Sequence, residues 1–593
     1  MSTTSHRTPR RRSAVALILV LAVLGAFVVR LVDIQVVNAD EHVADSMNLG
    51  FASSRVLWGE RGSIVDQGGA VLAGSTVFYD AELDPSLVDA VKRTGEDGKK
   101  VEVSWNDISA EIAAITGQTP EEVQAIVANA KAANPNGQWA SLKKGLDVDQ
   151  YRALADLRVP YMFFSRHPDR SYPDGAVAGN LVGFVGAEGE AQEGLELGMD
   201  ACLAASDGKE TFARGNNGET IPGTLKTSPA VNGGTLQLTI NRDLQWYLQQ
   251  LIAEETQNMR AISGTVTVVE VETGKIRAAA EYPTVDPNNV DGAHPDDRSS
   301  RIFRHQFEPG STFKAVTAAS IMDGGSATPL STVNAPSSFK FPNGAKVNDA
   351  MGHAPLNYTL AGALIDSSNV ALSMFGDMVE PAVRYDYMQR FGVGAPTSVG
   401  FPGEASGTLH DVAKWDNQSR YATTFGQAFT VTAPQVAGAY QAIANGGLKM
   451  PLRLVESCTR PDGTVVEPDL PKPEQIISEK VADDTALMVE NVMAQGQLQK
   501  ALAIPGYRVA AKTGTAEVAI PGGYKAGVYF TSLAGFAPAD DPKYVVVVTL
   551  EEPTAIRSSA ATAPAFQKAM TQVLKTYRVL PSSSETPLLP RYQ

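Results

Sequence analysis

The sequence predicts a multidomain α/β (α+β) protein with a single N-terminal transmembrane helix. One uncharged apolar run near the N-terminus is long enough to cross a bilayer. The length of 593 residues allows two or three domains. In the later part of the chain, strand patterns stand at both ends of a helical stretch. We therefore expect one sheet assembled from segments that are distant in the sequence.

The apolar run is Ser13–Val29, SAVALILVLAVLGAFVV, and as a helix it spans about 25 Å. Arg30 can extend its charge to the interface, so we place the anchor at residues 13–32. The basic residues before it are Arg7, Arg10, Arg11 and Arg12. The positive-inside rule then puts residues 1–12 in the cytoplasm as a short tail and the rest of the chain outside.

A cleaved signal peptide is the alternative interpretation of this run, because the small-residue segment Val37-Asn38-Ala39 follows it. That segment lies well beyond the apolar run, and the charges of Arg30 and Asp33 stand between the two. We therefore favour an uncleaved anchor in the cell membrane.

Charge and composition exclude several classes of function. The net charge of −15 argues against nucleic acid as the main partner. The seven histidines and the two cysteines show no metal-ligand spacing, so we expect neither a metal nor a cofactor. Cys202 and Cys458 could pair in an exported protein, but the sequence alone favours unpaired or buried apolar thiols.

Residues 48–227 are turn-rich, and we interpret them as a scaffold domain without chemistry of its own. Its first part, ERGSIVDQGGAVLA (Glu60–Ala73), predicts two extended pieces around a Gly-Gly turn. Residues Asp107–Ala133 predict two short amphipathic helices.

Residues 228–578 form the second predicted domain. A strand leads into a helix with Asn241 as its N-cap, and Gly264–Pro283 has the pattern of a hairpin. VVVVTL (Val545–Leu550) is too short to span a bilayer and predicts a buried strand. Residues 579–593 are rich in Pro and Ser, and we expect them to be disordered.

The pattern Ser-x-x-Lys occurs four times, and only one copy fits a reactive site. Ser311 follows a Pro-Gly turn and begins an apolar helix that we expect to be buried. Lys314 lies on the same face one turn later, where desolvation and the positive helix end favour its neutral form. It could then accept the serine proton. The alternative is a capping serine beside a solvent-facing lysine. The other copies are Ser141–Lys144, Ser206–Lys209 and Ser337–Lys340.

Two later motifs favour the reactive interpretation. Ser367-Ser368-Asn369 is a Ser-x-Asn motif, and Lys512-Thr513-Gly514-Thr515 contains the only Lys-Thr-Gly of the chain. Ser-x-Asn alone is weak, since it also occurs at residues 46–48. The ordered set of Ser-x-x-Lys, Ser-x-Asn and Lys-Thr-Gly is the signature of penicillin-binding proteins and class A β-lactamases.

From the membrane anchor to about residue 578, the sequence resembles the class B penicillin-binding proteins, FtsI-type. Arg61–Asp66 and Gly69–Ala73 are similar to the first motif of the family's pedestal; Arg170–Gly186 and Gly194–Asp200 are similar to later ones. Gly426–Gly447 is similar to a segment between the second and third catalytic motifs. The resemblance implies an elongated pedestal (dimerisation) domain at residues 48–227. It also implies a penicillin-binding transpeptidase domain at residues 228–578, with a serine β-lactamase-like sheet flanked by helices.

The resemblance also implies a role for each motif residue. Ser311 would be the acylated nucleophile, Lys314 its base, Ser367 a proton shuttle and Asn369 the residue that holds the substrate amide. Lys512 and Thr513 would bind the terminal carboxylate, and Lys512 would support proton transfer. Thr515, next to Gly514, would lie on a strand that pairs with the bound peptide. The N–H groups of Ser311 and Thr515 would form the oxyanion hole.

The implied activity is a serine D-Ala-D-Ala transpeptidase that crosslinks peptidoglycan stem peptides and is a target of penicillin and other β-lactams. A D,D-carboxypeptidase, a β-lactam-hydrolysing enzyme and a β-lactam sensor are the alternatives. No Glu-x-x-Leu-Asn motif follows Ser367, which disfavours the hydrolase. Only about 12 residues are expected on the cytoplasmic side of the membrane, which disfavours the sensor.

Asn369 in the second motif and the segment RLVDIQV after the anchor are similar to division-type members rather than to elongation-specific ones. The resemblance therefore implies a role at the division septum. It also implies a SEDS-family glycan polymerase and other divisome membrane proteins as partners.

Overall fold

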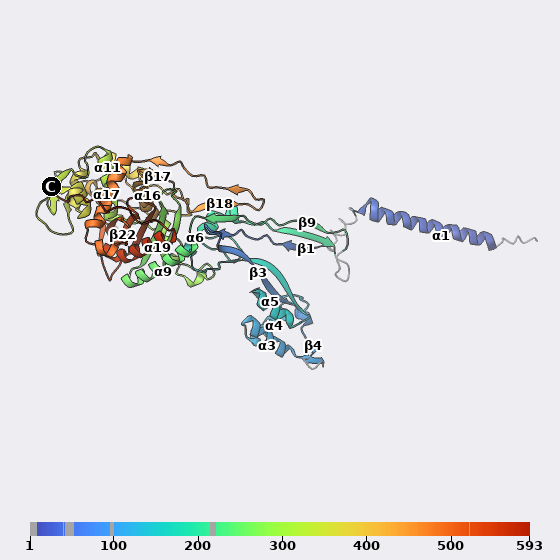
Figure 1. Ribbon diagram of the computed structural model, residues 1–593. Helices are drawn as coiled ribbons and strands as arrows, with labels where there is room; N and C mark the ends of the chain where they lie inside the picture. Colours follow the sequence, from blue (N-terminus) through green and yellow to red (C-terminus); the bar gives the residue numbers. More distant parts are fainter. Residues whose placement is uncertain (1–8, 40, 42–51, 95–99, 214–220, 521) are drawn as a thin grey trace, which may run out of the picture. The chain divides into compact units, whose positions relative to one another are not determined.

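The computed structural model describes residues 9–39, 41, 52–94, 100–213, 221–520 and 522–593 (Figure 1). The described chain divides into two units: Met1–Glu60 with Ala205–Asn232, and Arg61–Ala204 with Gly233–Gln593. The predicted boundaries at residues 48 and 228 do not coincide with this division. Most of the predicted scaffold lies in the second unit, because β2 (Ile64–Val65) pairs in parallel with β10 (Thr235–Leu238). Arg7, most of the predicted tail and the Ser-x-Asn copy at residues 46–48 lie outside the described residues.

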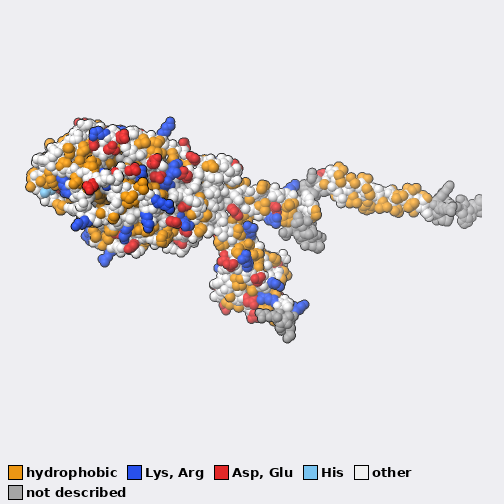
Figure 2. Space-filling model, viewed as in Figure 1, with side chains coloured by type: hydrophobic (Ala, Val, Ile, Leu, Met, Phe, Trp, Pro, Cys, Tyr) orange, Lys and Arg blue, Asp and Glu red, His pale blue; other side chains and the backbone are white. Residues whose placement is uncertain are grey.

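The first unit contains the helix α1 (Pro9–Val32) and a small antiparallel sheet of β1 (Ala52–Leu57), β8 (Gly208–Ala213) and β9 (Lys226–Ser228). Hydrophobic side chains cover α1 (Figure 2), and Phe27 is 65% exposed. A helical turn continues α1 over Asp33–Val37. Within the described residues, Ser13–Val37 is the one helical stretch long and apolar enough to cross a membrane. The predicted anchor helix is therefore present.

In the second unit, strands of Arg61–Ala204 and of the later chain form one mixed sheet, and Arg61–Ala204 also contains a helical subdomain. The strand order is β19 (Val465–Val466), β18 (Val455–Thr459), β10, β2, β3 (Val71–Leu83) and β6 (Ala140–Leu146), and β7 (Met162–Ser171) also pairs with β3. Both predicted helices of Asp107–Ala133 are confirmed, as α3 (Trp105–Thr116) and α4 (Pro120–Ala133). Ser104 caps α3, and Thr119 with Glu122 forms a capping box at α4. The remaining elements of this part are β4 (Val91–Thr94), β5 (Lys100–Val103), α5 (Val148–Asp156), α6 (Gly179–Val182), α7 (Gly194–Gly198) and α8 (Asp200–Leu203).

The centre of the second unit is a five-stranded antiparallel sheet in the order β12-β11-β23-β22-β21. Its strands are β11 (Ser263–Glu270), β12 (Ile276–Tyr282), β21 (Ala510–Ile520), β22 (Gly523–Ala537) and β23 (Tyr544–Glu551). The predicted hairpin forms β11 and β12, and the last strand of the domain pairs directly with β11. This confirms a single sheet built from sequence-distant pieces.

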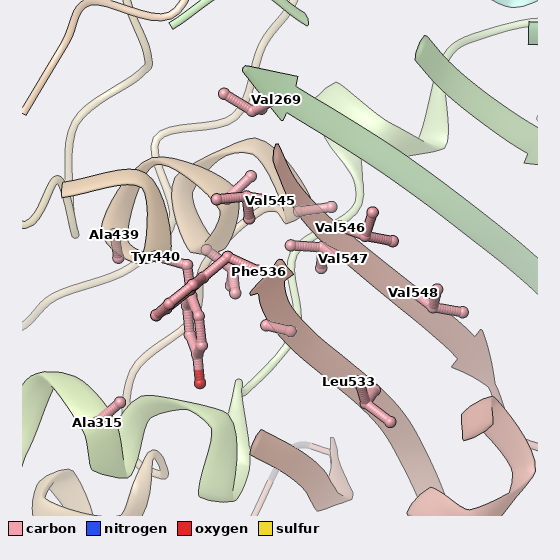
Figure 3. Close-up of a cluster of buried hydrophobic side chains, with 14 of the residues drawn as sticks. Val269, Ala315, Ala439, Tyr440, Leu533, Phe536, Val545, Val546, Val547 and Val548 are labelled. Atoms are coloured by element: carbon pink, nitrogen blue, oxygen red, sulfur yellow. The ribbon is translucent and has the colours of Figure 1, made fainter. Parts of the chain in front are cut away.

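Helices cover both faces of this sheet. α9 (Arg242–Met259), capped by Asn241 as predicted, packs with α19 (Ala563–Thr576), and α16 (Ala433–Ala444) packs against β23 from within the domain. Val545, Val546, Val547 and Val548 are all fully buried, so this strand is enclosed on both faces. Figure 3 shows these valines beside Phe536 and Tyr440, with Ala315 nearby. Ala315 belongs to α11 (Lys314–Asp323), the helix that follows the first motif.

The other elements of the second unit surround this sheet or extend the mixed one. They are α10 (Arg301–Arg304), β13 (Thr332–Ala335), β14 (Ser338–Lys340), β15 (Lys346–Asn348), β16 (Leu356–Thr359), α12 (Leu360–Ile365), α13 (Asn369–Gly376), α14 (Pro381–Arg390), α15 (Ser419–Ala422), β17 (Leu448–Lys449), β18 (Val455–Thr459), β19 (Val465–Val466), β20 (Glu474–Gln475), α17 (Glu479–Gln495) and α18 (Gln499–Leu502).

Two expectations from the sequence are wrong. Cys202 and Cys458 form a disulfide, which joins the end of α8 to β18 across 256 residues of sequence. Sequence spacing cannot reveal a pairing that the fold creates. Residues 579–593, expected to be disordered, instead make many hydrogen bonds with α17, β16 and α12. Side chains of the surrounding elements bind the backbone of this segment, and such contacts leave no pattern in its own composition.

Candidate active site

The first motif lies in a short 3₁₀ turn, Gly310–Phe313, which leads directly into α11. Gly310 has a φ of 56°, and its N–H donates to Gly426 O at 2.8 Å. A Cβ at this position would lie 3.0 Å from Thr515 O, so the turn approaches β21 closely. Neither the turn nor α11 is capped by a side chain, and Lys314 is fully buried. The alternative of a capping serine beside a solvent-facing lysine is therefore wrong.

Ser367 links the first motif to its lysine. Its Oγ lies 3.1 Å from Ser311 Oγ and 3.2 Å from Lys314 Nζ. Lys314 Nζ also donates to the backbone oxygen of Ser367 at 2.5 Å. We expected Lys314 to contact the Ser311 hydroxyl directly. The hydrogen bonds instead run from the lysine to Ser367 and from Ser367 to Ser311, which gives a proton a two-step path between them.

The third motif completes the same cluster from the other side. Lys512, on β21, donates to Ser367 Oγ at 3.0 Å and to Thr513 O at 3.2 Å. The Ser367 hydroxyl thus lies within hydrogen-bond distance of both lysines and of Ser311. Three segments that are more than fifty residues apart along the chain therefore meet at one oxygen atom.

Burial changes the charge of both lysines. Burial, and then the nearby charge of Lys512, holds the pKa of Lys314 well below its usual range, although Asp349 opposes this shift. Burial alone lowers the pKa of Lys512 to about 7. A neutral Lys314 can accept a proton, while Lys512 can still carry charge near neutral pH. The predicted lowering of the Lys314 pKa is confirmed in direction.

The second motif forms a tight corner between α12 and α13. Ser367 has a φ of 58°, a left-handed conformation that is costly for a residue other than glycine. Ser368 accepts from Ala371 N at 2.9 Å and so caps α13. The corner ends at Asn369, whose side chain donates to Asn348 O at 3.1 Å.

Asp349, which the sequence analysis did not identify, supports this corner. Its Oδ2 accepts from Ser368 Oγ at 2.8 Å, and its Oδ1 accepts from Val370 N at 3.0 Å. His353 Nε2 lies 2.9 Å from the same Oδ2. Asp349 stands outside every motif, so no spacing in the sequence indicates its role.

Glu308 lies just before the first motif and belongs to none of the three motifs. Its Oε1 accepts from Ala428 N at 2.8 Å and from the Tyr524 hydroxyl at 3.1 Å. Burial raises its pKa, against these hydrogen bonds. Glu308 therefore connects the turn before Ser311 to two neighbouring segments.

The remaining motif residues lie on the edge strand of the sheet. β21 ends the strand order, so its outer edge is not paired with another strand of this sheet. Gly514 packs against the Ser311 turn, where a Cβ would lie 2.7 Å from Pro309 O. Thr513 is partly buried next to Lys512. Thr515 is exposed, and its hydroxyl accepts from Ser559 N at 3.1 Å.

The other copies of Ser-x-x-Lys lack this setting. Ser141–Lys144 lies on β6, and Ser337–Lys340 includes β14, so both of these copies are extended rather than helical. The copy at Ser311–Lys314 differs from these two because it lies in a turn that leads into a buried helix.

The motif geometry agrees with what comparison with known families finds. The family model of the penicillin binding protein transpeptidase domain matches residues 264–571, and that of the Penicillin-binding Protein dimerisation domain matches residues 57–238. The chain belongs to the penicillin-binding protein transpeptidase family. Because it carries a dimerisation domain before the transpeptidase domain, it is a class B member.

Relatives of this penicillin-binding protein cover most of its length. Penicillin-binding protein PbpB of Mycolicibacterium smegmatis is 32% identical over 545 residues, which are 88% of this chain and 83% of that protein. Peptidoglycan D,D-transpeptidase FtsI of Escherichia coli K12 is 28% identical over 528 residues, 89% and 85% of the two chains.

Solved structures show the same fold for this penicillin-binding protein. A peptidoglycan synthetase from Bifidobacterium adolescentis has a TM-score of 0.71 at 28% identity, and the match covers 91% of this chain and 100% of that one. Penicillin binding protein 3 of Mycobacterium tuberculosis, complexed with aztreonam, has a TM-score of 0.68 at 26% identity, with the same coverage.

Proposed function

We propose that this peptidoglycan D,D-transpeptidase crosslinks stem peptides through an acyl-enzyme on Ser311. The transpeptidase activity follows from the family and from the D,D-transpeptidases among its relatives. The observation that most supports the serine mechanism is the position of the Ser367 hydroxyl, within 3.2 Å of Ser311, Lys314 and Lys512.

In the proposed acylation, Ser311 Oγ attacks the carbonyl carbon between the two terminal D-Ala residues. Its proton passes through Ser367 Oγ to the neutral Lys314 Nζ, and a C–O bond forms. The peptide C–N bond then breaks, and the departing D-Ala amine takes a proton back through Ser367. Deacylation reverses these steps: the amine of a second stem peptide attacks the ester, and Ser311 regains its proton.

The substrate would be held along the open edge of β21. An extended peptide can add to an unpaired sheet edge through main-chain hydrogen bonds. In this pose, Lys512 and Thr513 would receive the terminal carboxylate, and Asn369 would hold the substrate amide. The N–H groups of Ser311 and Thr515 would stabilise the oxyanion. The close packing of the Ser311 turn on Gly514 supports this arrangement.

Replacement of Ser311 tests the chemistry directly. We expect Ser311→Ala to abolish covalent labelling by a fluorescent penicillin and to fail to rescue cells depleted of the wild-type protein. Thr312→Ser changes the adjacent buried hydroxyl residue and is the matched control, which should still be labelled. Labelling of Ser311→Ala would refute the assignment. Rapid hydrolysis of the drug, or release of D-Ala without crosslinking, would instead indicate a hydrolase or a carboxypeptidase.

We also propose that the enzyme acts at the division septum, with residues 1–12 in the cytoplasm and the domains outside the membrane. The FtsI name of several relatives and the Asn369 form of the second motif support this role. A SEDS-family glycan polymerase would then be its membrane partner, together with other divisome proteins. A fluorescent fusion located along the sidewall or at the poles, rather than at midcell, would contradict the septal role and favour elongation.

A further inference from the structure

We call residues 582–593 the tail segment. It follows a defined course from the loop before β21 to the second motif. The segment begins where Ser582 N donates to Gly506 O at 2.9 Å. It then passes along α17 and ends beside β16 and α12. These contacts all lie within one unit of the molecule. The tail segment is therefore an ordered part of the domain.

Side chains of α17 hold the middle of the tail segment by its backbone. Asn491, which is fully buried, donates to Pro587 O at 2.9 Å and accepts from Leu589 N at 2.9 Å. Gln495, one turn later, donates to Leu589 O at 2.8 Å. A buried amide that satisfies both an N–H and a C=O group of an extended chain fixes its register.

The end of the tail segment pairs with β16 and the start of α12. Thr359, which is fully buried, donates from its N–H to Arg591 O at 2.9 Å and from its hydroxyl to Pro590 O at 2.7 Å. Gln593 N donates to Asn357 O at 3.1 Å. Gly362 lies under this contact, since a Cβ there would be 1.9 Å from Arg591 O. The tail segment thus fits against α12 with no space for a methyl group.

Two tail side chains then bind the residue that precedes the second motif. Arg591 Nη1 donates to Asp366 Oδ1 at 2.7 Å, and the Tyr592 hydroxyl donates to Asp366 Oδ2. Arg591 also donates to the backbone oxygen of Gln495 at the end of α17. Both carboxylate oxygens of Asp366 are therefore bound by the tail segment.

Asp366 matters because Ser367 follows it in a left-handed conformation. Such a backbone conformation persists only where the flanking residues hold it. On the one side Asp349 binds Ser368 and Val370, as described above. On the other side Asp366 ends α12, and Arg591 and Tyr592 hold it.

We infer that Arg591 and Tyr592 are positioning residues, which hold Asp366 so that the Ser367 hydroxyl stays between Ser311 and the two lysines. The inference rests on the serine mechanism proposed above. The tail segment contacts neither Ser311 nor a lysine of the motifs, so it acts on the rate of acylation through the corner at residues 366–368.

The double variant Arg591→Ala/Tyr592→Ala tests this inference in the full-length protein. We expect the first-order rate of Ser311 acylation by a penicillin to fall about tenfold, while the half-saturating drug concentration changes less than about twofold. The matched control is Leu588→Ala, since Leu588 belongs to the same segment and is 68% exposed. It should acylate like the wild type.

Hydrogen exchange separates positioning from a general loss of stability. In the double variant, amides of residues 364–370 should exchange faster, while those of β11 and β23 keep their protection. Wild-type acylation rates together with unchanged exchange at residues 364–370 would overturn the inference. Exchange that becomes faster by the same factor at residues 364–370 and across the sheet would also overturn the inference.

Gly362→Ala approaches the same contact from the opposite partner. A helical Gly→Ala change normally stabilises a helix, but here the methyl group must displace the tail segment. We expect the same loss in acylation rate as in the double variant. A more stable protein with wild-type acylation would contradict the proposal.

A truncated variant and a synthetic peptide test whether the tail segment can restore activity when it is added separately. A variant that ends at Pro581 should acylate slowly, and a synthetic peptide of residues 582–593 should restore the rate. The same peptide with Ala in place of Arg591 and Tyr592 should not. Equal rescue by both peptides would exclude a role for these side chains. If Ser311 of the wild type is not acylated, the proposed serine mechanism fails. If the wild type is acylated at Ser311 and the tail variants are acylated equally fast, this inference alone fails.

Discussion

Lys314 Nζ lies 3.2 Å from Ser367 Oγ, and that hydroxyl lies 3.1 Å from Ser311 Oγ. The lysine of the first motif, which we propose as the base, is therefore connected to the proposed nucleophile Ser311 through a residue of the second motif. This relationship makes the corner between α12 and α13 part of the proposed proton path, and it leads to the predictions below.

Lys314→Met should separate catalysis from stability. Methionine keeps most of the lysine volume but has no basic group, so we expect acylation by penicillin to fall about 10²- to 10⁴-fold. Because Lys314 is fully buried and its charged form is disfavoured there, the thermal midpoint should stay equal or rise. A calorimetric scan beside a labelling time course measures both. A variant that keeps wild-type labelling would show that Lys314 is not the base.

Ser367→Ala and Ser367→Gly form a matched pair. Both remove the hydroxyl that links Ser311 to the lysines, so both should slow acylation by about 10²-fold or more. Only glycine relieves the left-handed φ of 58°, so the glycine variant should be more stable than the alanine variant by about 1 kcal/mol. Urea denaturation gives the difference. Equal stability of the two variants would argue against backbone strain at this corner.

Substrate binding should weaken as the pH rises above neutrality. The pKa of Lys512 is about 7 in the folded protein, so the lysine loses its charge, and its attraction for a carboxylate, above that pH. We expect the half-saturating penicillin concentration to increase between about pH 7 and about pH 9. Lys512→Arg keeps its charge throughout this range, so it should remove the dependence. A constant half-saturating concentration in the wild type would contradict the prediction.

The same lysine should link stability to pH. Its pKa falls from an ordinary value of 10.5 to about 7 on folding, so the unfolded state binds more protons between these two values. The free energy of unfolding contributed by Lys512 therefore increases as the pH rises through this window, and below about pH 7 the burial cost is fully present. Lys512→Met should flatten the slope in urea titrations. An unchanged slope would mean that other groups dominate this range.

Loss of the disulfide should destabilise the second unit. The bridge from Cys202 to Cys458 closes a long loop, and its removal in Cys202→Ser/Cys458→Ser should cost about 2–4 kcal/mol. The wild type should lose a similar amount in a reductant, while the double variant should be insensitive to it. Thermal melts with and without reductant test this. Equal melting of wild type and variant under oxidising conditions would show that the bridge contributes nothing to stability.

Local patterns identified much of the fold. The apolar helix of Ser13–Val29, the two helices of Asp107–Ala133 and the hairpin of Gly264–Pro283 all formed as predicted, because their signals lie in adjacent residues. The three motifs also carried enough information to select Ser311 among four Ser-x-x-Lys copies. Asp349, in contrast, has no local pattern, and its contacts with Ser368 and Val370 arise only when β15 and α13 come together.

The sequence by itself determined the anchor, the order of the elements and the types of the reactive groups. Hydrophobic periodicity, capping and motif identity are properties of neighbouring residues, so they can be recognised without the tertiary structure. Tertiary structure alone decided that Lys314 reaches Ser311 through Ser367, that Cys202 pairs with Cys458, and that a Pro- and Ser-rich segment lies ordered beside the second motif. Each of these depends on distances between segments that are remote in the chain. A hydrogen bond requires its two atoms to lie about 3 Å apart, whatever their separation along the sequence. Only the packing of the whole core brings remote segments that close together.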